Sequence, residues 1–323
     1  MLLYRIKYTF VRLVFKYLPW IFRPWEKRLV RKYGEVQSDI PVVFIIGAPR
    51  SGSTILYQVI TSFLDVNYIN NFIDLTRENI NVGFCLSKKL INDGPHNSFK
   101  SDFGKTADEG LNAPSEGMFW YKWLPKDKHY VTRKDVSEKN KKLLKRKVAA
   151  ILNKYRKPLI IKNLSFSVRL DLLFDVFPDA RIIVIKRNKI DNALSILKGR
   201  HMNGVPENKM WSILPQNFLD LEMEPDEETL VVKQIYSIEK QIHDDIQLYP
   251  ESQRIEINYE DLLKTPEEII NNIKSFLSVD EKKDLRSIND LLVRREIEKG
   301  YKGKNHIIEL IENYNWTDYN EQA

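Results

Sequence analysis

An anion-binding loop is the strongest chemical signal in this sequence. Residues 47–54, GAPRSGST, follow the continuous β-branched and aromatic run at 41–46 and precede a segment with helical apolar spacing. In a strand–loop–helix unit, glycines let the backbone curl so that several amides point at one anion, and the helix N-terminus adds partial positive charge. We therefore predict a phosphate-binding loop here and prefer it to a glycine-rich turn without a ligand.

The positive charge of this loop lies in an unusual place. The spacing Gly-x4-Gly-x-Thr matches a P-loop, but Ser53 occupies the position of the usual lysine, and the cation is Arg50, inside the loop. Kinases and triphosphatases with a P-loop use that lysine and a metal to neutralise the β- and γ-phosphates. The loop therefore argues against such an enzyme and favours a smaller, less charged group.

The loop resembles the 5′-phosphosulfate loop of the sulfotransferases that use 3′-phosphoadenosine 5′-phosphosulfate (PAPS). In that family an arginine that ends a strand and a serine eight residues later hold the 3′-phosphate, and Arg187 and Ser195 match this pattern. A helical path of that length covers roughly 10–12 Å, part of which the long arginine side chain can bridge. The resemblance also implies which residues hold the 5′-phosphate and the sulfuryl oxygens: Arg50, Ser51, Gly52, Ser53 and Thr54.

The resemblance also suggests residues for the chemistry. The family commonly has a lysine at the end of the strand that corresponds to PLIIK, and here it is Lys162. We expect Lys162 and Arg50 to stabilise charge on the transferring group. The alternative for Lys162 is a strand-end side chain that reaches solvent.

The base that takes the proton of the acceptor is predicted to be Glu116. The small-molecule branch of the family has a histidine two residues after the lysine, but this chain has Leu164 there. Glu116 lies in a segment that resembles the Pro-x-Glu-x-x-Phe stretch of many bacterial members, and a carboxylate can act as general base. The alternative is a first-turn helix glutamate that only favours the helix dipole. Glu109 and His96 are the reserve candidates.

Four aromatic residues are candidates for an acceptor platform. Aromatic clusters more often belong to the hydrophobic core, so we favour the core and keep the platform as the alternative. The residues are Trp120, Tyr121, Trp123 and Trp211.

Alternating strand and helix segments predict the scaffold that positions these residues. Strands are expected at 158–162 and 181–186 with a helix between them, a further helix from 191, and a late strand that starts at 254. This order implies a parallel sheet with crossover helices. We predict a single α/β domain with a P-loop-like fold over residues 38–323, with helices on both faces of a central parallel sheet. PAPS would lie across the carboxyl ends of the strands.

Composition limits the remaining classes. The 323 residues are 43% hydrophobic and 29% charged, which is typical of a globular chain. Lys and Arg outnumber Asp and Glu by 51 to 44, which suits an anionic ligand and equally a merely basic enzyme. We expect no nucleic-acid partner. The single cysteine, Cys85, excludes an intrachain disulfide and is consistent with the cytoplasm, and no His or Cys pair has metal-ligand spacing, so we expect no metal.

Residues 1–37 read as a basic amphipathic N-terminal arm. Apolar and aromatic residues alternate there with Arg and Lys, and Pro19 and Pro24 interrupt the segment. The apolar runs are too short to span a bilayer. We favour a basic helix packed on the domain, with peripheral contact to a membrane as the alternative. Residues 133–147 are charge-dense, and we favour a solvated helix face over a polyanion-binding one.

Together these features predict an enzyme that transfers a sulfuryl group from PAPS to a hydroxyl or amine and releases 3′-phosphoadenosine 5′-phosphate (PAP). The acceptor could be a glycan, a glycolipid or a small metabolite. Two rivals remain: a P-loop kinase or other nucleotide-binding protein, and a non-catalytic protein that binds PAP.

Overall fold

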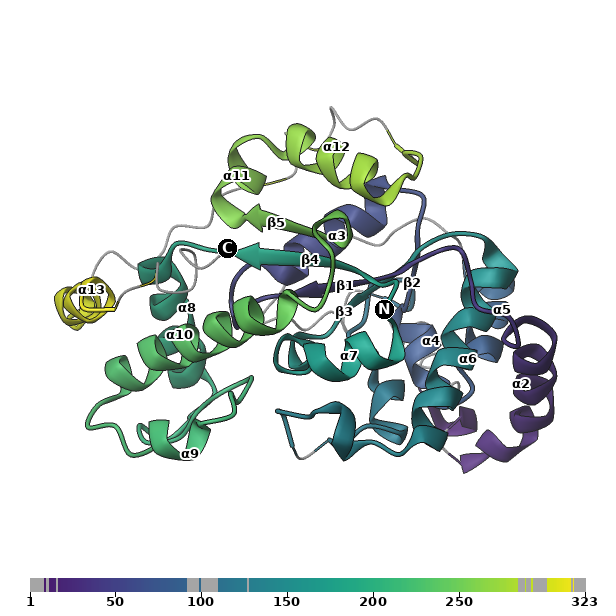
Figure 1. Cartoon of the computed structure of the whole chain (residues 1–323), viewed down its shortest axis with the longest axis horizontal. Coiled ribbons are helices and arrows are strands. Elements are labelled where there is room, and N and C mark those ends of the chain that lie inside the picture. The colour runs from purple at the N-terminus through teal and green to yellow at the C-terminus, as the bar shows by residue number, and fades with distance from the viewer. Residues whose placement is uncertain are drawn as a thin grey trace.

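A five-stranded parallel sheet forms the centre of the protein in a computed structural model (Figure 1). The described residues are 9, 12–15, 17–91, 99, 110–126, 128–283, 288, 292, 301–314 and 316. The strands, in their order across the sheet, are β2 (Asn67–Tyr68), β3 (Leu159–Lys162), β1 (Val42–Ile46), β4 (Arg181–Lys186) and β5 (Arg254–Asn258). The predicted α/β fold with a central parallel sheet is confirmed, and the two-residue strand β2 is an addition to it.

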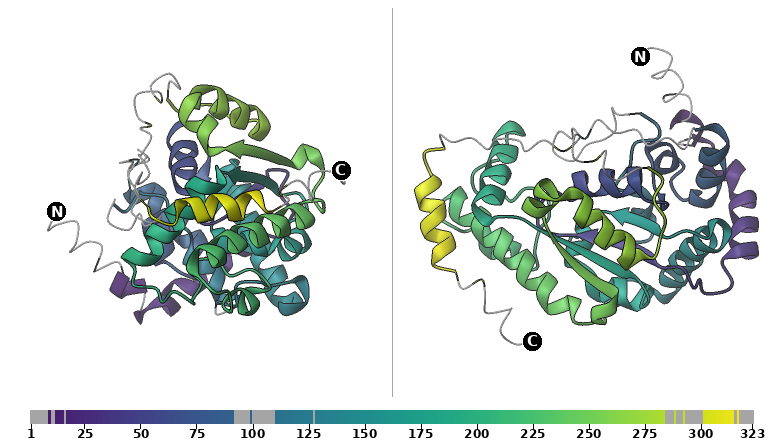
Figure 2. Two further views of the ribbon diagram at one scale, coloured as in Figure 1. Left: turned by 90° about the vertical axis from the view of Figure 1, so that its left-hand side faces the viewer. Right: turned by 90° about the horizontal axis from the view of Figure 1, so that it is seen from above.

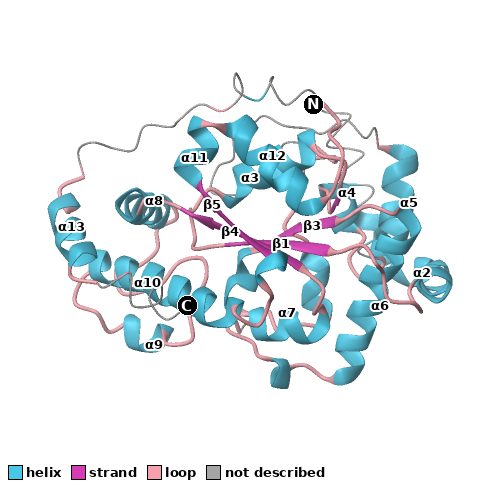
Figure 3. Ribbon diagram, turned by 45° about the horizontal axis from the view of Figure 1, so that its top comes forward, coloured by secondary structure: helices cyan, strands magenta, loops and turns pink. Residues whose placement is uncertain are grey.

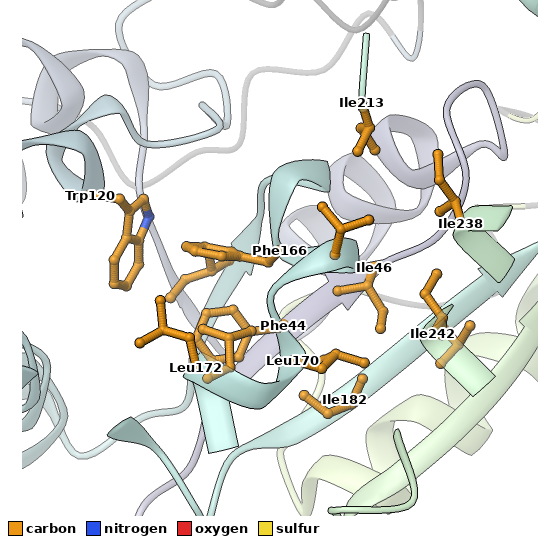
Figure 4. Packing of buried hydrophobic residues seen from close by; sticks show 14 of the residues in the cluster. Phe44, Ile46, Trp120, Phe166, Leu170, Leu172, Ile182, Ile213, Ile238 and Ile242 are labelled. Atoms are coloured by element: carbon orange, nitrogen blue, oxygen red, sulfur yellow. The ribbon is translucent and has the colours of Figure 1, made fainter. Parts of the chain in front are cut away.

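Strand β1 shows why the sheet is buried on both faces. Its five residues are all buried, and successive side chains point to opposite faces. Phe44 and Ile46 belong to one hydrophobic cluster, whereas Val43 and Ile45 belong to the other. Figure 4 shows Phe44 and Ile46 within the first cluster. A continuous apolar run in the sequence is therefore the signature of this strand.

Helices cover both faces of the sheet (Figure 3). On one face lie α3 (Ser53–Phe63), α11 (Tyr259–Lys264) and α12 (Pro266–Leu277). On the other face lie α6 (Glu138–Tyr155), α7 (Leu170–Val176), α8 (Lys189–Met202) and α10 (Glu227–Ile246). Further helices are α2 (Pro19–Tyr33), α4 (Asn71–Leu75), α5 (Ile80–Leu90), α9 (Phe218–Leu221) and α13 (Lys304–Glu312), with short 3-10 helices η2 (Met118–Lys122), η3 (Arg133–Asp135), η4 (Leu164–Val168) and η5 (Glu251–Gln253).

Helix α2, from the predicted N-terminal arm, packs on α5 and α6. Its buried Glu26 accepts a hydrogen bond from the buried Lys147 of α6 at 2.5 Å. Lys141 of α6 is also buried and pairs with Asp175 at 2.6 Å. The prediction of a solvated face over residues 133–147 is therefore wrong for these two lysines, because distant carboxylates neutralise them. Among the described helices, none is long and apolar enough to cross a membrane.

Candidate active site

Three neighbouring strands bring the predicted site residues to one edge of the sheet. Strand β1 lies between β3 and β4, and all three run parallel. Lys162 is the last residue of β3, Gly47 follows β1, and Arg187 follows β4. The carboxyl ends of parallel strands are the usual place for a ligand site in an open α/β sheet. The sheet order therefore places the loop, the lysine and the arginine at such a position.

The loop after β1 is tightly curled. Arg50 has a φ of +64° and Gly52 a φ of +96°, both in the left-handed region. The Ser167 hydroxyl donates to the Gly47 carbonyl at 2.9 Å and accepts from the Gly47 amide at 3.0 Å. The Asn192 amide donates to the Pro49 carbonyl at 2.5 Å. Side chains from η4 and α8 therefore hold the loop backbone in a fixed shape.

Two arginines and a serine meet at this loop. The Arg50 Nε donates to the Ser195 Oγ at 3.1 Å, and the Arg187 Nη1 donates to the Arg50 carbonyl at 2.9 Å. The Arg187 guanidinium also lies 4.8 Å from the centre of the Tyr259 ring, over its face, in a cation–π contact. The structure thus joins the cation of the loop to the arginine–serine pair that the sequence singled out.

Lys162 and Glu116 form an ion pair next to the loop. The Lys162 Nζ lies 2.5 Å from Glu116 Oε1. The lysine side chain is 3% exposed, whereas the glutamate side chain is 50% exposed. Lys162 is therefore held within the protein and does not reach solvent as a simple strand-end residue would, whereas the side chain of Glu116 is half-exposed.

Asp74 holds the segment that carries Glu116. Its carboxylate, at the end of α4, accepts from the Ser115 hydroxyl at 2.7 Å and from the Met118 amide at 2.5 Å. Burial raises the pKa of the Asp74 carboxyl above its usual value, although these two hydrogen bonds lower it. Glu116 lies between the two donors in an irregular stretch before η2. The alternative of a first-turn helix glutamate is therefore wrong.

A profile of the sulfotransferase family matches residues 41–283. This is more than half of the 323 residues. The chain belongs to the sulfotransferase family. The matched region begins at β1 and includes the loop, the Lys162–Glu116 pair, Arg187 and Ser195.

Solved bacterial sulfotransferases share this fold. Sulfotransferase STF9 from Mycobacterium avium has a TM-score of 0.51 and 13% identity, with 90% of this chain and 81% of that chain covered. Sulfotransferase STF1 from Mycobacterium tuberculosis H37Rv has a TM-score of 0.50, 13% identity and the same coverage of 90% and 81%. Identities this low support a common fold alone. A search of curated proteins finds no match.

Among the aromatic residues of this sulfotransferase, Trp120 is part of the core. It is buried, and its ring lies 5.2 Å from that of Phe166 and 6.2 Å from that of Phe44 (Figure 4). The acceptor platform is therefore wrong for Trp120. Trp123 and Trp211 are partly buried against the same core. Tyr121 differs, because its hydroxyl lies 3.2 Å from the Ser165 hydroxyl, just after β3.

Three supporting residues of the site were not predicted: Asp74, Ser167 and Asn192. Asn192 had a signal in the sequence, because it lies three residues before Ser195 and therefore on the same side of α8. Asp74 and Ser167 act through contacts with distant segments, so the local sequence carried no signal for either residue. The reserve bases Glu109 and His96 lie outside the described residues.

Proposed function

We propose that this sulfotransferase uses PAPS as donor and transfers its sulfuryl group to a hydroxyl or amine of an acceptor. The observation that carries the proposal is the pair of hydrogen bonds that join Arg50 to Ser195 and to Arg187. They bring the loop expected to bind the 5′-phosphosulfate and the residues expected to bind the 3′-phosphate into one site. PAPS carries its 3′-phosphate and its 5′-phosphosulfate on the same ribose, so one site must hold both groups.

The site has polar groups that fit a phosphorylated ligand. The Ser51 Oγ and the Arg187 Nε are buried and have no hydrogen-bond partner within the described part of the chain. A buried donor without a partner is costly unless a ligand or water satisfies it. The helix α3 begins at Ser53, so its N-terminal amides point toward the same loop. Ser51, Ser53 and Thr54 of the loop are the proposed contacts to the 5′-phosphate and sulfuryl oxygens, with Gly52.

In the proposed reaction Glu116 removes a proton from the acceptor hydroxyl or amine. The acceptor atom attacks sulfur, and its new bond forms as the bond from sulfur to the 5′-phosphate oxygen breaks. That oxygen leaves with the bonding electrons as part of PAP. Lys162 and Arg50 stabilise charge on the sulfuryl and bridging oxygens. Because Lys162 is buried and Glu116 half-exposed, the lysine stays near the donor while the carboxylate can turn to the acceptor.

The proposal is tested by turnover. The protein is incubated with PAPS and a panel of glycans, glycolipids and small metabolites in a buffer with a chelator. PAP release and the mass gain of one sulfuryl group on an acceptor are expected. PAP binding without turnover on any acceptor would favour the non-catalytic rival. Transfer of a phosphoryl group from ATP, dependent on magnesium, would favour the kinase.

Gly52→Ala is expected to lower the affinity for PAP about tenfold or more. A Cβ at Gly52 would lie 2.2 Å from Cδ2 of Tyr259, whose ring supports the Arg187 guanidinium. Moving the ring disturbs both the loop and the arginine, and each tenfold loss corresponds to about 1.4 kcal/mol. Isothermal titration calorimetry with PAP measures the effect.

Gly204→Ala is the matched control. Gly204 has a φ of +61°, but a Cβ there would meet nothing within 4 Å. Both variants carry the cost of an alanine in the left-handed region, about 1–2 kcal/mol of folding stability. The loss of PAP affinity should occur in Gly52→Ala alone. Equal PAP affinity in the two variants would remove the role of the Tyr259 contact.

Asp74→Asn is expected to lower kcat about 10- to 100-fold with little change in PAP affinity. The amide offers one acceptor oxygen to two donors, so the Ser115–Met118 segment shifts and Glu116 with it. The control is Asp226→Asn, because Asp226 also accepts from a backbone amide and a hydroxyl, both of Thr229. A merely structural Asp74 would lower the thermal midpoint and kcat together.

The pH dependence of stability tests the burial of the Asp74 carboxyl. The pKa of Asp74 is raised in the folded protein. Ionisation of Asp74 therefore lowers the free energy of unfolding of the wild type as the pH rises above about 4. The asparagine variant lacks this loss. Its stability relative to the wild type should therefore increase from acidic to neutral pH, as measured by urea unfolding.

A further inference from the structure

The outer face of helix α2 combines aromatic and basic side chains. Four apolar side chains at the start of the helix are exposed: Leu18, Trp20, Ile21 and Trp25. The exposed Arg23 of the same stretch pairs with Glu78 of a neighbouring segment. Along its second half the exposed side chains are basic: Lys27, Arg28, Arg31 and Lys32. Trp20 is 60% exposed and Trp25 40% exposed, which is unusual for tryptophan on a protein surface. These eight residues are called the α2 face below.

The α2 face is held rigidly, because the inner side of the helix is anchored. Glu26, the one acidic residue in the sequence of α2, is buried and accepts from Lys147, from the Asn81 amide at 3.1 Å and from the Val82 backbone amide at 3.0 Å. Leu29 and Val30 are buried beside it. The inner side therefore removes the only negative charge of the helix from the surface, and the α2 face carries basic and apolar side chains without an acidic one.

Within the described part of the chain, the position of α2 leaves this face exposed. The helix lies at the right-hand edge of the molecule in Figure 1, and the view from above in Figure 2 places it there again. Helices α5 and α6 contact its inner side. Helix α13 lies at the opposite end of the molecule (Figure 3). The α2 face is thus a peripheral surface at one end of the elongated axis.

We propose that the α2 face docks on the surface of an anionic lipid membrane. Tryptophan prefers the boundary between headgroups and acyl chains, and exposed Lys and Arg are attracted to anionic headgroups. The α2 face presents both in sequence along one helix, so the apolar start can enter the boundary while the basic half remains among the headgroups. The proposal is independent of the sulfuryl donor.

Charge also argues against a second copy of the chain as the occupant. Two copies that meet through this face would bury its four basic side chains either against each other or against the apolar half of the partner helix, and in both cases without an acidic partner, which is unfavourable. A nucleic acid would match the charge but would leave Trp20 and Ile21 without apolar contacts. An anionic bilayer accommodates both halves of the face.

Vesicle binding tests the proposal on the full chain. Co-sedimentation with vesicles of phosphatidylcholine and phosphatidylserine is compared with vesicles of phosphatidylcholine alone. Binding is expected to the anionic vesicles and should weaken as salt is raised. The double variant Arg28→Gln, Arg31→Gln should bind the anionic vesicles about fivefold more weakly per charge removed. Trp20→Ala with Trp25→Ala should weaken it about tenfold.

A matched control removes two charges elsewhere. Lys264→Gln with Lys304→Gln changes exposed residues of α11 and α13 and should leave vesicle binding unchanged. Circular dichroism verifies that each variant is folded. No binding of the wild type to anionic vesicles would overturn the proposal, as would an equal loss in the control and in the arginine variant. A third outcome would assign the face to a second copy of the chain. In that case the wild type forms oligomers and does not bind vesicles, and the double variant Trp20→Ala, Trp25→Ala no longer forms oligomers.

Discussion

Glu116→Gln is expected to lower kcat for sulfuryl transfer by about 10²- to 10⁴-fold, the usual contribution of a general base. The amide is close in shape to the carboxylate and can still accept a hydrogen bond from Lys162, which lies 2.5 Å from Oε1. It cannot take the proton of the acceptor. The affinity for PAP should therefore change little, because Glu116 acts on the acceptor and not on the donor. Steady-state kinetics with an acceptor found by the panel gives kcat, and calorimetry gives the PAP affinity.

The control for this variant is Glu138→Gln. Glu138 also accepts from a lysine, Lys141 at 2.7 Å, but it lies on the exposed side of α6. It should keep full activity. If Glu116→Gln kept the wild-type kcat, the base would lie elsewhere, and Glu109 and His96 would be tested next. If both kcat and PAP affinity fell, Glu116 would serve mainly to position Lys162.

Arg187→Ala is expected to lower the affinity for PAP about 10- to 100-fold. A hydrogen bond to a charged group contributes about 1.5–3 kcal/mol, and the planar guanidinium can make two such bonds to one phosphate. The affinity for adenosine 5′-monophosphate, which lacks the 3′-phosphate, should change much less. Arg187→Lys keeps the positive charge but loses the planar guanidinium. Its affinity for PAP should lie between those of the wild type and Arg187→Ala.

Arg254→Ala is the control for the arginine. Arg254 begins β5, at the opposite edge of the sheet from the loop, and bonds to Gln247 at 2.8 Å. It should leave the affinity for both nucleotides unchanged. Equal losses for PAP and for adenosine 5′-monophosphate in Arg187→Ala would mean that Arg187 supports the loop, through its bond to the Arg50 carbonyl, and does not read the 3′-phosphate.

Much of the fold was readable because its signals are local. The strands at 42–46, 159–162 and 181–186 are short continuous runs of apolar, largely β-branched residues, and such runs suit a sheet that is covered on both faces. The order of strands and helices then implied the parallel sheet. Strand β2 has two residues, which is too short for any periodicity to appear.

The candidate site was readable where its residues follow strands. The loop and Arg187 come directly after β1 and β4, and parallel strands end at one edge, so their proximity followed from topology. The supports of the site were not readable. Asp74 holds a segment 41 to 44 residues away, and Ser167 bonds to Gly47 across 120 residues. Nothing in the local sequence of either residue specifies such a partner.

Burial of charge was the other feature that the sequence did not reveal. Lys147 belongs to a run of basic residues that suggests a solvated helix, yet it is buried against Glu26, which lies 121 residues earlier. A buried lysine requires a partner, and that partner comes from a helix whose packing depends on the tertiary fold. Pairing across such a distance becomes visible only when the helices α2 and α6 are placed together.

The central claim, that this sulfotransferase takes PAPS as its donor, is tested most directly by isothermal titration calorimetry with PAP. Adenosine 5′-monophosphate and ATP serve as controls, and no metal is added. We predict tight binding of PAP, much weaker binding of both controls, and loss of the preference for PAP in Arg187→Ala. Binding of ATP as tight as that of PAP or tighter, strengthened by magnesium, would contradict the claim and favour a P-loop kinase.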